Sequence, residues 1–359
     1  MRISRLRLQT FRNISFVDLS FSGDIHFFSG KNAQGKTNLL EALGMVSALR
    51  SFRAHDINTI IKQGDRQAQM VYNIEGVGFK SAEVSINLKK KGKEIEVDGE
   101  RISRFRDFIG SFPTVVMSSH DIQLLRGSPG VRRQWLNLVL ASSNQSYYDN
   151  LRDYHRLLAE RNSLLKKFAG SNEMKAFEAG LADKAVRLFK VRSDEIPRLQ
   201  RHLKDAYLQI SPEDENVKMA YKPDFEAISR EGYLKQLEKS REKDRILKST
   251  QHGPHRDDLD LGLEGRKARD FGSEGQQRSL MIALKIAQSR FVEESNGISP
   301  VLLADDVLCE LDDLRKSNFW HALGKGVQVF ATGTEIPNED DGKKWQVFTV
   351  RDGTFTEAD

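Results

Sequence analysis

Apolar and polar side chains alternate through much of the first hundred residues. A period of two is typical of strands that bury one face. The pattern predicts one hairpin across the Arg12-Asn13 turn and another across the lysine-rich turn from Lys89 to Lys93. The predicted strands cover residues 3–8, 17–21, 71–74, 84–88 and 95–97. We therefore expect an antiparallel β lobe in this part of the chain.

Continuous apolar runs indicate a second kind of strand, buried on both faces. Ile25–Phe28 is such a run, and residues 38–49 after it carry apolar side chains at helical spacing. Residues 301–304, 327–331 and 346–350 are further apolar runs, and the last of them turns at Asp352-Gly353. Strand and helix alternation of this kind predicts an α/β domain.

The middle of the chain has a different texture. Residues 131–247 are polar and highly charged, with apolar positions at helical spacing. We expect Pro197, Pro212 and Pro223 to break this stretch into helices of ordinary length, which excludes one long coiled coil. The predicted organisation is an α/β domain in residues 1–120 and 249–359, with a mostly helical lid inserted at 121–248.

Composition narrows the class of protein. The 359 residues are 38% hydrophobic and 30% charged, which is typical of a soluble globular protein. The net charge of +5 suits contact with phosphate backbones without requiring it. The single cysteine excludes an intrachain disulfide, and the histidines show no zinc spacing. We find no signal peptide and no membrane-spanning run, so we expect a cytoplasmic location.

The strongest chemical signal follows the 25–28 strand. Gly30-Lys31-Asn32-Ala33-Gln34-Gly35-Lys36-Thr37 fits the pattern G-x-x-x-x-G-K-[ST] of a phosphate loop. Its backbone N–H groups surround phosphates, Lys36 reaches the β- and γ-phosphates, and the Thr37 hydroxyl is a Mg²⁺ ligand. A chance match is the alternative, but the flanking strand and helix favour the functional interpretation. The loop therefore predicts binding of ATP with Mg²⁺.

Two acids at the end of the 301–304 strand complete this chemistry. We expect Asp305 to lie on the Mg²⁺ side and Asp306 to orient or deprotonate the attacking water. A solvated acid pair at a strand end is common, so the pair gains its meaning from the phosphate loop upstream.

Between these motifs, Phe271 to Arg278 opens a helix predicted over residues 279–292. Ser273, Gly275 and Gln276 combine a hydroxyl, exposed N–H groups and a helix N-terminus, which together can bind an anion. Taken alone, the segment is better explained as an ordinary helix cap with a glycine hinge.

Nearby, His255-Arg256-Asp257-Asp258 could suggest a metal or catalytic site. We favour a structural or nucleotide-sensing role for it, because it lies just before the predicted anion-binding helix.

The order of the motifs resembles that of ABC-type ATPases, and the substrings resemble the RecF family, which is related to the SMC proteins. The resemblance covers essentially the whole chain. It is carried by Phe11-Arg12-Asn13, GKNAQGKTNLLEA, Gly127-Ser128-Pro129 with Arg132-Arg133, GPHRDD from Gly253, GSEGQQR from Gly272, and DDVLCELD from Asp305. The chain departs from the family pattern at Glu274, Cys309 and Asn137, where Gln, Ser and Asp are usual.

The resemblance implies an ABC-type head, with a mixed sheet, an antiparallel β lobe, a helical lid and no long coiled coil. In such heads two molecules enclose two ATP molecules. Ser273, Gly275 and Gln276 would then bind the γ-phosphate of the partner's ATP, and Glu310-Leu311-Asp312 would lie along the dimer interface. Asp306 stands where transporters use glutamate, which implies slow hydrolysis, and a threonine of Thr332-Gly333-Thr334 would replace their switch histidine.

The resemblance also implies partners. RecF proteins bind duplex DNA near single-strand gaps and, with RecO and RecR, help load RecA in recombinational repair, replication and the SOS response. Basic segments that could contact DNA are Lys89–Lys93, Arg132-Arg133 and Lys166-Lys167, although each such segment is more often a solvated face than a DNA contact.

Three alternatives remain open. A transport ATPase subunit fits poorly with the basic helical insertion and with GQQR. An SMC-type tether would need hundreds of heptad residues. A non-enzymatic scaffold that uses ATP only to fix its shape is disfavoured by the presence of both Asp305 and Asp306.

Overall fold

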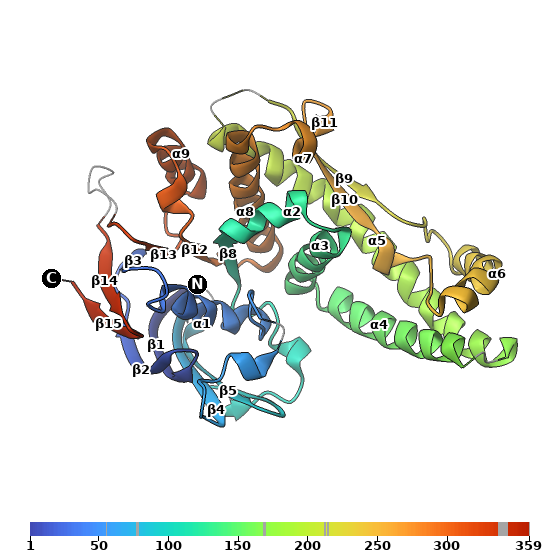
Figure 1. Cartoon of the computed structure of the whole chain (residues 1–359), viewed down its shortest axis with the longest axis horizontal. Helices are drawn as coiled ribbons and strands as arrows, with labels where there is room; N and C mark the ends of the chain where they lie inside the picture. The colour runs from blue at the N-terminus through green and yellow to red at the C-terminus, as the bar shows by residue number, and fades with distance from the viewer. Residues whose placement is uncertain are drawn as a thin grey trace. The chain divides into compact units, whose positions relative to one another are not determined.

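The computed structural model describes residues 1–54, 56–76, 79–167, 170–211, 213, 215–336 and 344–358. The chain forms two compact units (Figure 1). The first contains Met1–Asp121, Asp205–Asp214 and Arg278–Asp359, and the second contains Ile122–Lys204 and Glu215–Gln277. Residues 249–277, which the sequence-based division places in the α/β domain, thus group with the helix-rich unit.

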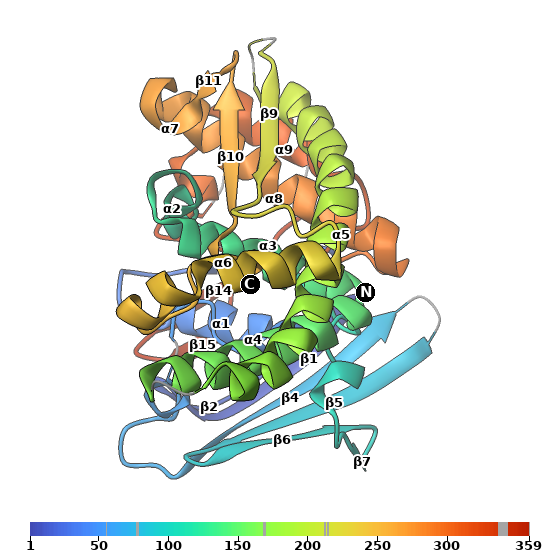
Figure 2. The same ribbon diagram turned by 90° about the vertical axis from the view of Figure 1, so that its right-hand side faces the viewer.

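The first unit contains the expected antiparallel lobe, a six-stranded sheet of order β2-β1-β4-β5-β6-β7. Its long strands β1, β4 and β5 run side by side in Figure 2. Leu6 pairs with Leu19 and Leu8 with Val17, so the alternating apolar residues share one buried face. The strands are β1 (Arg2–Phe11), β2 (Ile14–Ser20), β4 (Gln67–Gly76), β5 (Phe79–Lys89), β6 (Gly92–Val97) and β7 (Glu100–Arg101).

A second sheet in this unit has the order β15-β14-β3-β13-β12-β8, and only the β14–β15 pair is antiparallel. Its central strands are buried on both faces, as their continuous apolar runs predict. The strands are β3 (Ile25–Ser29), β8 (Thr114–Ser118), β12 (Val301–Asp305), β13 (Val329–Gly333), β14 (Gln346–Arg351) and β15 (Thr354–Glu357). Because β3, β12 and β13 are parallel, the residues that follow them meet at one sheet edge.

Helices cover this sheet and complete the first unit. Helix α1 packs against β12 and β8, and one hydrophobic core joins α1 to both sheets. The helices are α1 (Lys36–Ala48), η1 (Ile57–Thr59), η2 (Phe105–Asp107), η3 (Ser119–Ile122), α8 (Glu274–Asn296), η5 (Leu308–Glu310) and α9 (Asp313–Leu323). Only the part of α8 from Arg278 onward belongs to this unit.

The second unit is mostly helical, as expected, but it also contains a small antiparallel sheet of order β11-β10-β9. Its strands are β9 (Val217–Lys222), β10 (Asp258–Leu263) and β11 (Arg266–Lys267). Its helices are α2 (Gln123–Arg126), α3 (Pro129–Ser143), α4 (Gln145–Lys166), α5 (Ser171–Ile210), α6 (Arg230–Leu247), η4 (Pro254–Arg256) and α7 (Ala268–Phe271).

The expected break at Pro197 is wrong, because α5 runs for 40 residues straight through it. Proline removes one helical hydrogen bond, but Pro197 lies on the exposed side of the helix. Ile196, Leu199 and Leu203 are buried on the other side, and their packing offsets the lost bond. Pro223 follows the end of β9, and Pro212 lies outside the described residues.

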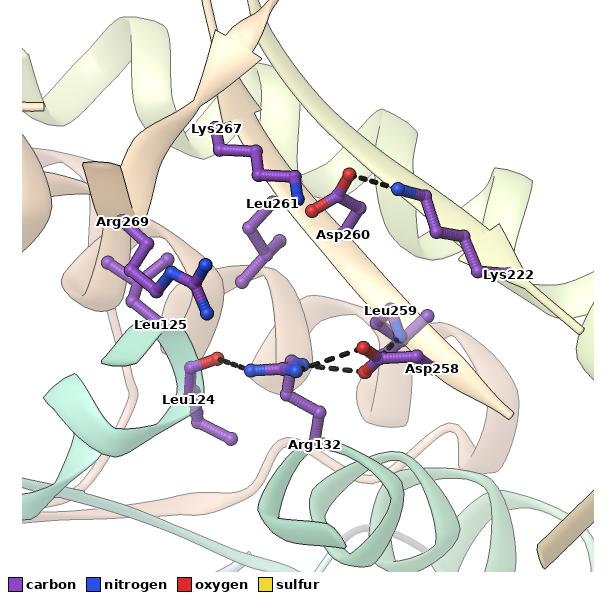
Figure 3. Close-up of a pocket in the computed structure, with 10 residues that line it drawn as sticks. All are labelled: Leu124, Leu125, Arg132, Lys222, Asp258, Leu259, Asp260, Leu261, Lys267 and Arg269. Carbon is purple, nitrogen blue, oxygen red and sulfur yellow. Dashed lines mark hydrogen bonds and ion pairs between the residues drawn. The ribbon is translucent and has the colours of Figure 1, made fainter. Parts of the chain in front are cut away.

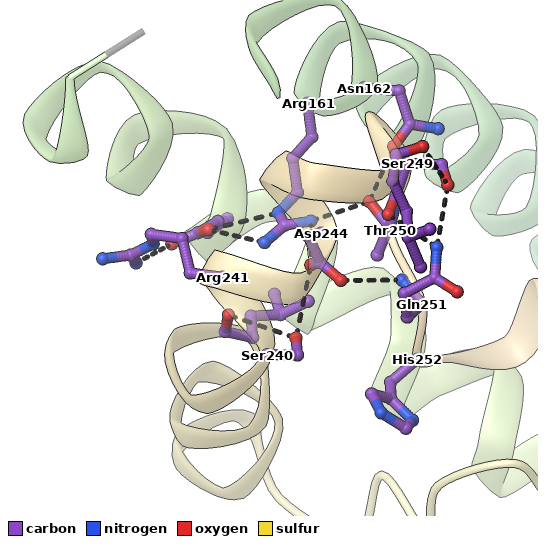
Figure 4. A network of polar contacts seen from close by, with 12 residues as sticks. Arg161, Asn162, Ser240, Arg241, Asp244, Ser249, Thr250, Gln251 and His252 are labelled. Atoms are coloured by element: carbon purple, nitrogen blue, oxygen red, sulfur yellow. Dashed lines mark hydrogen bonds and ion pairs between the residues drawn. The ribbon is translucent and has the colours of Figure 1, made fainter. Parts of the chain in front are cut away.

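Buried charges hold α4, α5 and α6 together within the second unit (Figure 4). Arg161 of α4 donates to Glu178 of α5 over 3.1 Å and to Asp244 of α6 over 2.7 Å. Arg241 of α6 donates to the other oxygen of Glu178 over 2.9 Å. We call Arg161, Glu178, Arg241 and Asp244 the ionic cluster. Its two positive and two negative charges compensate one another, as buried ions require.

Candidate functional site

The phosphate loop joins β3 to α1 in a conformation that needs glycine. Gly35 is the N-cap of α1 with φ of 113°, and a Cβ there would lie 2.9 Å from the Asn13 side-chain oxygen. A Cβ on Gly30 would meet the Val350 carbonyl oxygen at 2.4 Å. No side chain caps the N-terminus of α1, so its positive dipole end faces the loop.

Lys36 supplies the cation at the centre of the loop. Its side chain is almost completely buried, and its ammonium donates to the carbonyl oxygens of Gly30 and, over 3.3 Å, Lys31. The loop carbonyls therefore hold the ammonium inside the phosphate loop, where it can bind a phosphate.

Turns from distant parts of the first unit brace this loop. The Asn13 side chain donates to the Gln34 carbonyl oxygen over 3.2 Å, and Gly353 N–H donates to the same oxygen over 2.9 Å. Asp352 N–H donates to the Gln34 side chain over 2.8 Å. The sequence indicated Asn13 as part of a hairpin turn and of a family motif, but it did not predict this bracing role.

The end of β12 meets the start of α1 at the edge of the sheet. Thr37 Oγ1 donates to Asp305 Oδ1 over 2.9 Å, although the two residues are 268 positions apart. Thr332, at the end of β13, lies 3.0 Å from the same oxygen and 3.3 Å from Asp306 Oδ1. Asp306 N–H donates back to the Thr332 hydroxyl over 2.9 Å. The two predicted acids and the predicted hydroxyl are thus brought together, with Thr332 as a buried link between the acids.

Burial raises the pKa of Asp305 above its usual range, and the charge of Asp306 adds to this effect, while hydrogen bonds from Thr37 and Thr332 oppose it. A nearby cation would favour the ionised form of such a carboxylate. A hydroxyl and a carboxylate beside a phosphate site form the oxygen ligand set that Mg²⁺ prefers. The residues present therefore fit the ion that the loop implies.

Ser273 and Gln276 form a reciprocal cap at the start of α8. Ser273 N–H donates to Gln276 Oε1 over 2.6 Å, and Gln276 N–H donates to Ser273 Oγ over 3.2 Å. This is a capping box, so the ordinary-cap interpretation describes the geometry correctly. It leaves the serine hydroxyl hydrogen free of the helix, so the segment keeps a donor for an anion. These residues belong to the second compact unit, whereas Lys36, Thr37 and Asp305 belong to the first.

The next residue, Gln277, is a buried anchor for this helix start. It accepts from Arg126 over 2.8 Å and donates to the carbonyl oxygens of Ala268 and Gly272.

The acids of GPHRDD pair with buried or half-buried arginines. Asp257 accepts from Arg192 over 2.6 Å and from the Tyr221 hydroxyl. Asp258 accepts two bonds from Arg132, of 2.7 and 3.0 Å, beside the small β9–β10 sheet (Figure 3). Within the described ranges, no group of three or more histidines, cysteines and acids could hold a metal ion. This geometry fits the structural role of the GPHRDD segment. Arg132, a candidate DNA contact, is already paired with Asp258.

Some of the other predicted contact residues have local partners. Arg133 donates to the Asp257 carbonyl oxygen, and Lys89 pairs with Glu94 over 2.6 Å. Lys166 and Lys167 are exposed at the end of α4. Asp312 caps α9 by accepting from Arg315 N–H, while the side chain of Glu310 lies outside the described part of the chain.

The helices of the described residues include none that is both long enough and apolar enough to cross a membrane.

Comparison with known proteins assigns the family. A family model described as the RecF/RecN/SMC N terminal domain matches residues 2–336. The DNA replication and repair protein RecF of Halalkalibacterium halodurans is 34% identical over 354 residues, which cover 95% of this chain and 94% of that protein. A solved structure of the recombination mediator protein RecF with ATP in the RecFOR pathway has a TM-score of 0.91 at 30% identity, covering 99% and 97% of the two chains.

A more distant structure shares only the fold. The Smc head domain of Pyrococcus furiosus, with an extended coiled coil, has a TM-score of 0.57 at 15% identity and covers 99% of this chain and 95% of its own. The mixed sheet, antiparallel lobe and helical unit together form the expected ABC-type ATPase head. The chain belongs to the RecF family of DNA replication and repair proteins.

Proposed function

We propose that the chain is an ATP-dependent DNA-binding clamp of the RecF type, which dimerises when it binds ATP and hydrolyses ATP slowly. The observation that carries this proposal is the 2.9 Å contact between Thr37 Oγ1 and Asp305 Oδ1 beside the phosphate loop. It joins the two halves of a nucleotide site that are far apart in the sequence. The RecF structure with ATP supports the choice of nucleotide.

In this proposal the loop from Gly30 to Thr37 holds the phosphates with backbone N–H groups, and Lys36 moves from the loop carbonyls to the β- and γ-phosphates. Thr37 and Asp305 hold Mg²⁺. When bound, the ion neutralises charge that develops on the phosphates.

Asp306 and Thr332 act on the hydrolysis step. Asp306 is in a left-handed conformation with φ of 58°, and its N–H bond to Thr332 fixes that conformation. We propose that Asp306 orients or deprotonates the attacking water. An aspartate is shorter than the glutamate of transporter-type heads and holds the water less closely, which makes hydrolysis slow.

The dimer is proposed to close through the segment at the start of α8. Ser273, Gly275 and Gln276 of one molecule form the γ-phosphate site for the ATP of the other, and Glu310-Leu311-Asp312 lie along the interface. ATP stabilises the dimer only while its γ-phosphate is present, because binding to one state alone shifts an equilibrium toward that state.

Duplex DNA near single-strand gaps is the proposed partner of the closed dimer. The relatives' description as replication and repair proteins supports this choice, and the RecFOR pathway of the solved structure supports RecR, with RecO, as protein partners. Loading of RecA, a part in the SOS response and a cytoplasmic location belong to the same proposal. Lys90, Lys91, Lys166 and Lys167 are exposed cations that could contact the phosphate backbone.

The test compares dimerisation and duplex-DNA binding with ATP, with ADP, and with ATP in Lys36→Ala. We expect the natural protein to dimerise and to bind duplex DNA tightly with ATP but not with ADP. We expect Lys36→Ala to do neither with ATP. Dimerisation without hydrolysis would favour the alternative of a nucleotide-dependent scaffold. Equal DNA binding in all three samples would contradict the ATP-gated clamp.

A further inference from the structure

Both the oxygen and the nitrogen of the Gln276 carboxamide bind partners inside its own compact unit. Its oxygen accepts from Ser273 N–H over 2.6 Å, and its nitrogen donates to a carboxylate oxygen of Glu215. A carboxylate only accepts and an N–H only donates, so the orientation of the amide is fixed by its two partners. The side chain is therefore held within its own unit, and only its second amide hydrogen lies outside these two bonds.

Glu215 is itself held in a defined position just before β9. The next residue, Asn216, exchanges two bonds with Glu264: its N–H donates to the Glu264 carboxylate, and its carbonyl oxygen accepts from Glu264 N–H over 3.0 Å. Val217 then pairs with Leu263 of β10. The Glu215 carboxylate is thus carried by a sheet edge, and it reaches the first turn of α8 across 61 positions of sequence.

The capping box sets the direction of the Ser273 hydroxyl. Ser273 Oγ accepts from Gln276 N–H, so its lone pair faces the helix and its hydrogen is available on the outer side. Ser273 is exposed, whereas Glu215 and Gln276 are half-buried. The groups presented to an incoming anion are therefore the serine hydroxyl and the N–H groups of the first turn, Gly275 among them.

We propose that Glu215 and Gln276 are positioning residues that hold Ser273 ready for the γ-phosphate of a partner molecule, and that Ser273 and Gly275 make the direct contacts. This inference rests on the proposed function and refines it. Glu215 acts through Gln276, because its hydrogen bond keeps the Gln276 oxygen on Ser273 N–H. Without that bond the carboxamide rotates freely and the cap loosens.

The test compares Glu215→Ala, which removes the acceptor, with Glu215→Gln, which keeps an acceptor oxygen for Gln276. Glu264→Gln is the matched control, because it removes the same charge nearby and retains an acceptor for Asn216. For Glu215→Ala we expect the ATP concentration for half-maximal dimerisation to rise about tenfold over the two sites of a dimer. Glu215→Gln and Glu264→Gln should stay within about twofold of the natural protein.

A second measurement needs no nucleotide. Amide hydrogen exchange of a peptide covering residues 272–277 should be faster in Glu215→Ala than in Glu215→Gln, because the Ser273 N–H loses its acceptor. Unchanged exchange in Glu215→Ala would overturn the positioning role, and so would faster exchange with unchanged dimerisation. If the natural protein does not dimerise with ATP, the proposed function fails, while the exchange result still decides whether Glu215 orders the cap.

Discussion

Thr332 is the residue that links the two acids of the site. Its hydroxyl lies within hydrogen-bond distance of both carboxylates and accepts from the Asp306 N–H, and its side chain is completely buried. A threonine of the 332–334 segment was expected to stand in for the switch histidine. The geometry supports that hypothesis for Thr332, because no other side chain contacts both acids among the described hydrogen bonds.

Replacing Thr332 by valine should lower the ATP hydrolysis rate by about tenfold to a hundredfold. The change removes the hydroxyl at nearly constant volume, raises the pKa of Asp305 further and frees the Asp306 backbone. Binding of ATP should change by less than about threefold, since the phosphate loop is untouched. Thr332→Ser, which keeps the hydroxyl, is the control, and a full hydrolysis rate in Thr332→Val would contradict the role.

His26 is buried in the parallel sheet as a neutral ring. Gln328 is fixed by the backbone of Ile3, so its amide nitrogen must donate to His26 Nε2 over 3.2 Å, and His26 Nδ1 then donates to Gln346 over 2.9 Å. Burial lowers the pKa of His26 to about 4, while the hydrogen bond to Gln346 opposes this shift. Protonation would place two N–H groups against each other.

The stability of the protein should therefore fall at acidic pH. The folded-state pKa of His26 is below its unfolded value of about 6.5, so its contribution is present above pH 6.5 and is lost as the pH falls toward about 4. Between pH 7 and pH 5 this group alone should remove about 2 kcal/mol from the free energy of unfolding.

Urea unfolding of the natural protein and of His26→Asn at the two pH values measures the effect. The variant should be less stable at pH 7 but should lose about 2 kcal/mol less on acidification. An equal loss in both proteins would show that His26 is not the titrating group.

At the scale of the elements, the ionic cluster stabilises the packing of α4, α5 and α6 against one another. Asp244 is completely buried and accepts from Arg161 and Ser240 and from Gln251 N–H. Asp244→Ala leaves the Arg161 charge without this partner and should cost about 3–5 kcal/mol in the free energy of unfolding.

Glu242→Ala provides the matched control on the same helix. Glu242 pairs with Arg245 at the surface, where an ion pair contributes about 0–1 kcal/mol. Chemical unfolding of both variants tests the comparison, and similar losses from the two substitutions would mean that burial of the cluster is not what stabilises the helices.

Elements with a clear period were predictable, and elements that depend on distant partners were not. The alternation in β1 and β2 has a period of two, and β3 and β12 are continuous apolar runs; each forms the expected strand. Strand β9 was missed because it pairs with β10, whose residues come much later in the sequence. Lys222 pairs with Asp258, 36 positions on, and Val217 pairs with Leu263, 46 positions on. Local rules also failed at Pro197, where buried neighbours outweigh one lost hydrogen bond.

At the scale of the whole molecule, the sequence pointed to the site chiefly through its motifs. Thr37, Asp305 and Asp306 could be named because the chemistry of phosphate transfer needs those groups after particular strands. The bracing of Gln34 by Asp352 and Gly353 could not be predicted, because contacts across more than 300 positions leave no local pattern. Glu215 could not be identified for the same reason, because its contact with Gln276 spans 61 positions and forms only in the folded chain.

The motifs of the nucleotide site are divided between the two compact units. Lys36, Thr37, Asp305 and Asp306 lie in one unit, and Ser273 and Gln276 lie in the other. We propose that a complete ATP site combines the first set from one molecule with the second set from another. Each molecule would then carry two halves of two different sites.

Mixing two inactive variants tests this claim most directly. Lys36→Ala removes the phosphate-loop half, and Ser273→Arg blocks the other half. Homodimers of either variant have no complete site, whereas a mixed dimer has one. We predict that each variant alone shows almost no ATP-driven dimerisation or hydrolysis, that Ser273→Arg still binds ATP as a monomer, and that the mixture recovers hydrolysis above the sum of its parts. Full hydrolysis by Ser273→Arg alone, or no recovery on mixing, would contradict a site shared between two molecules.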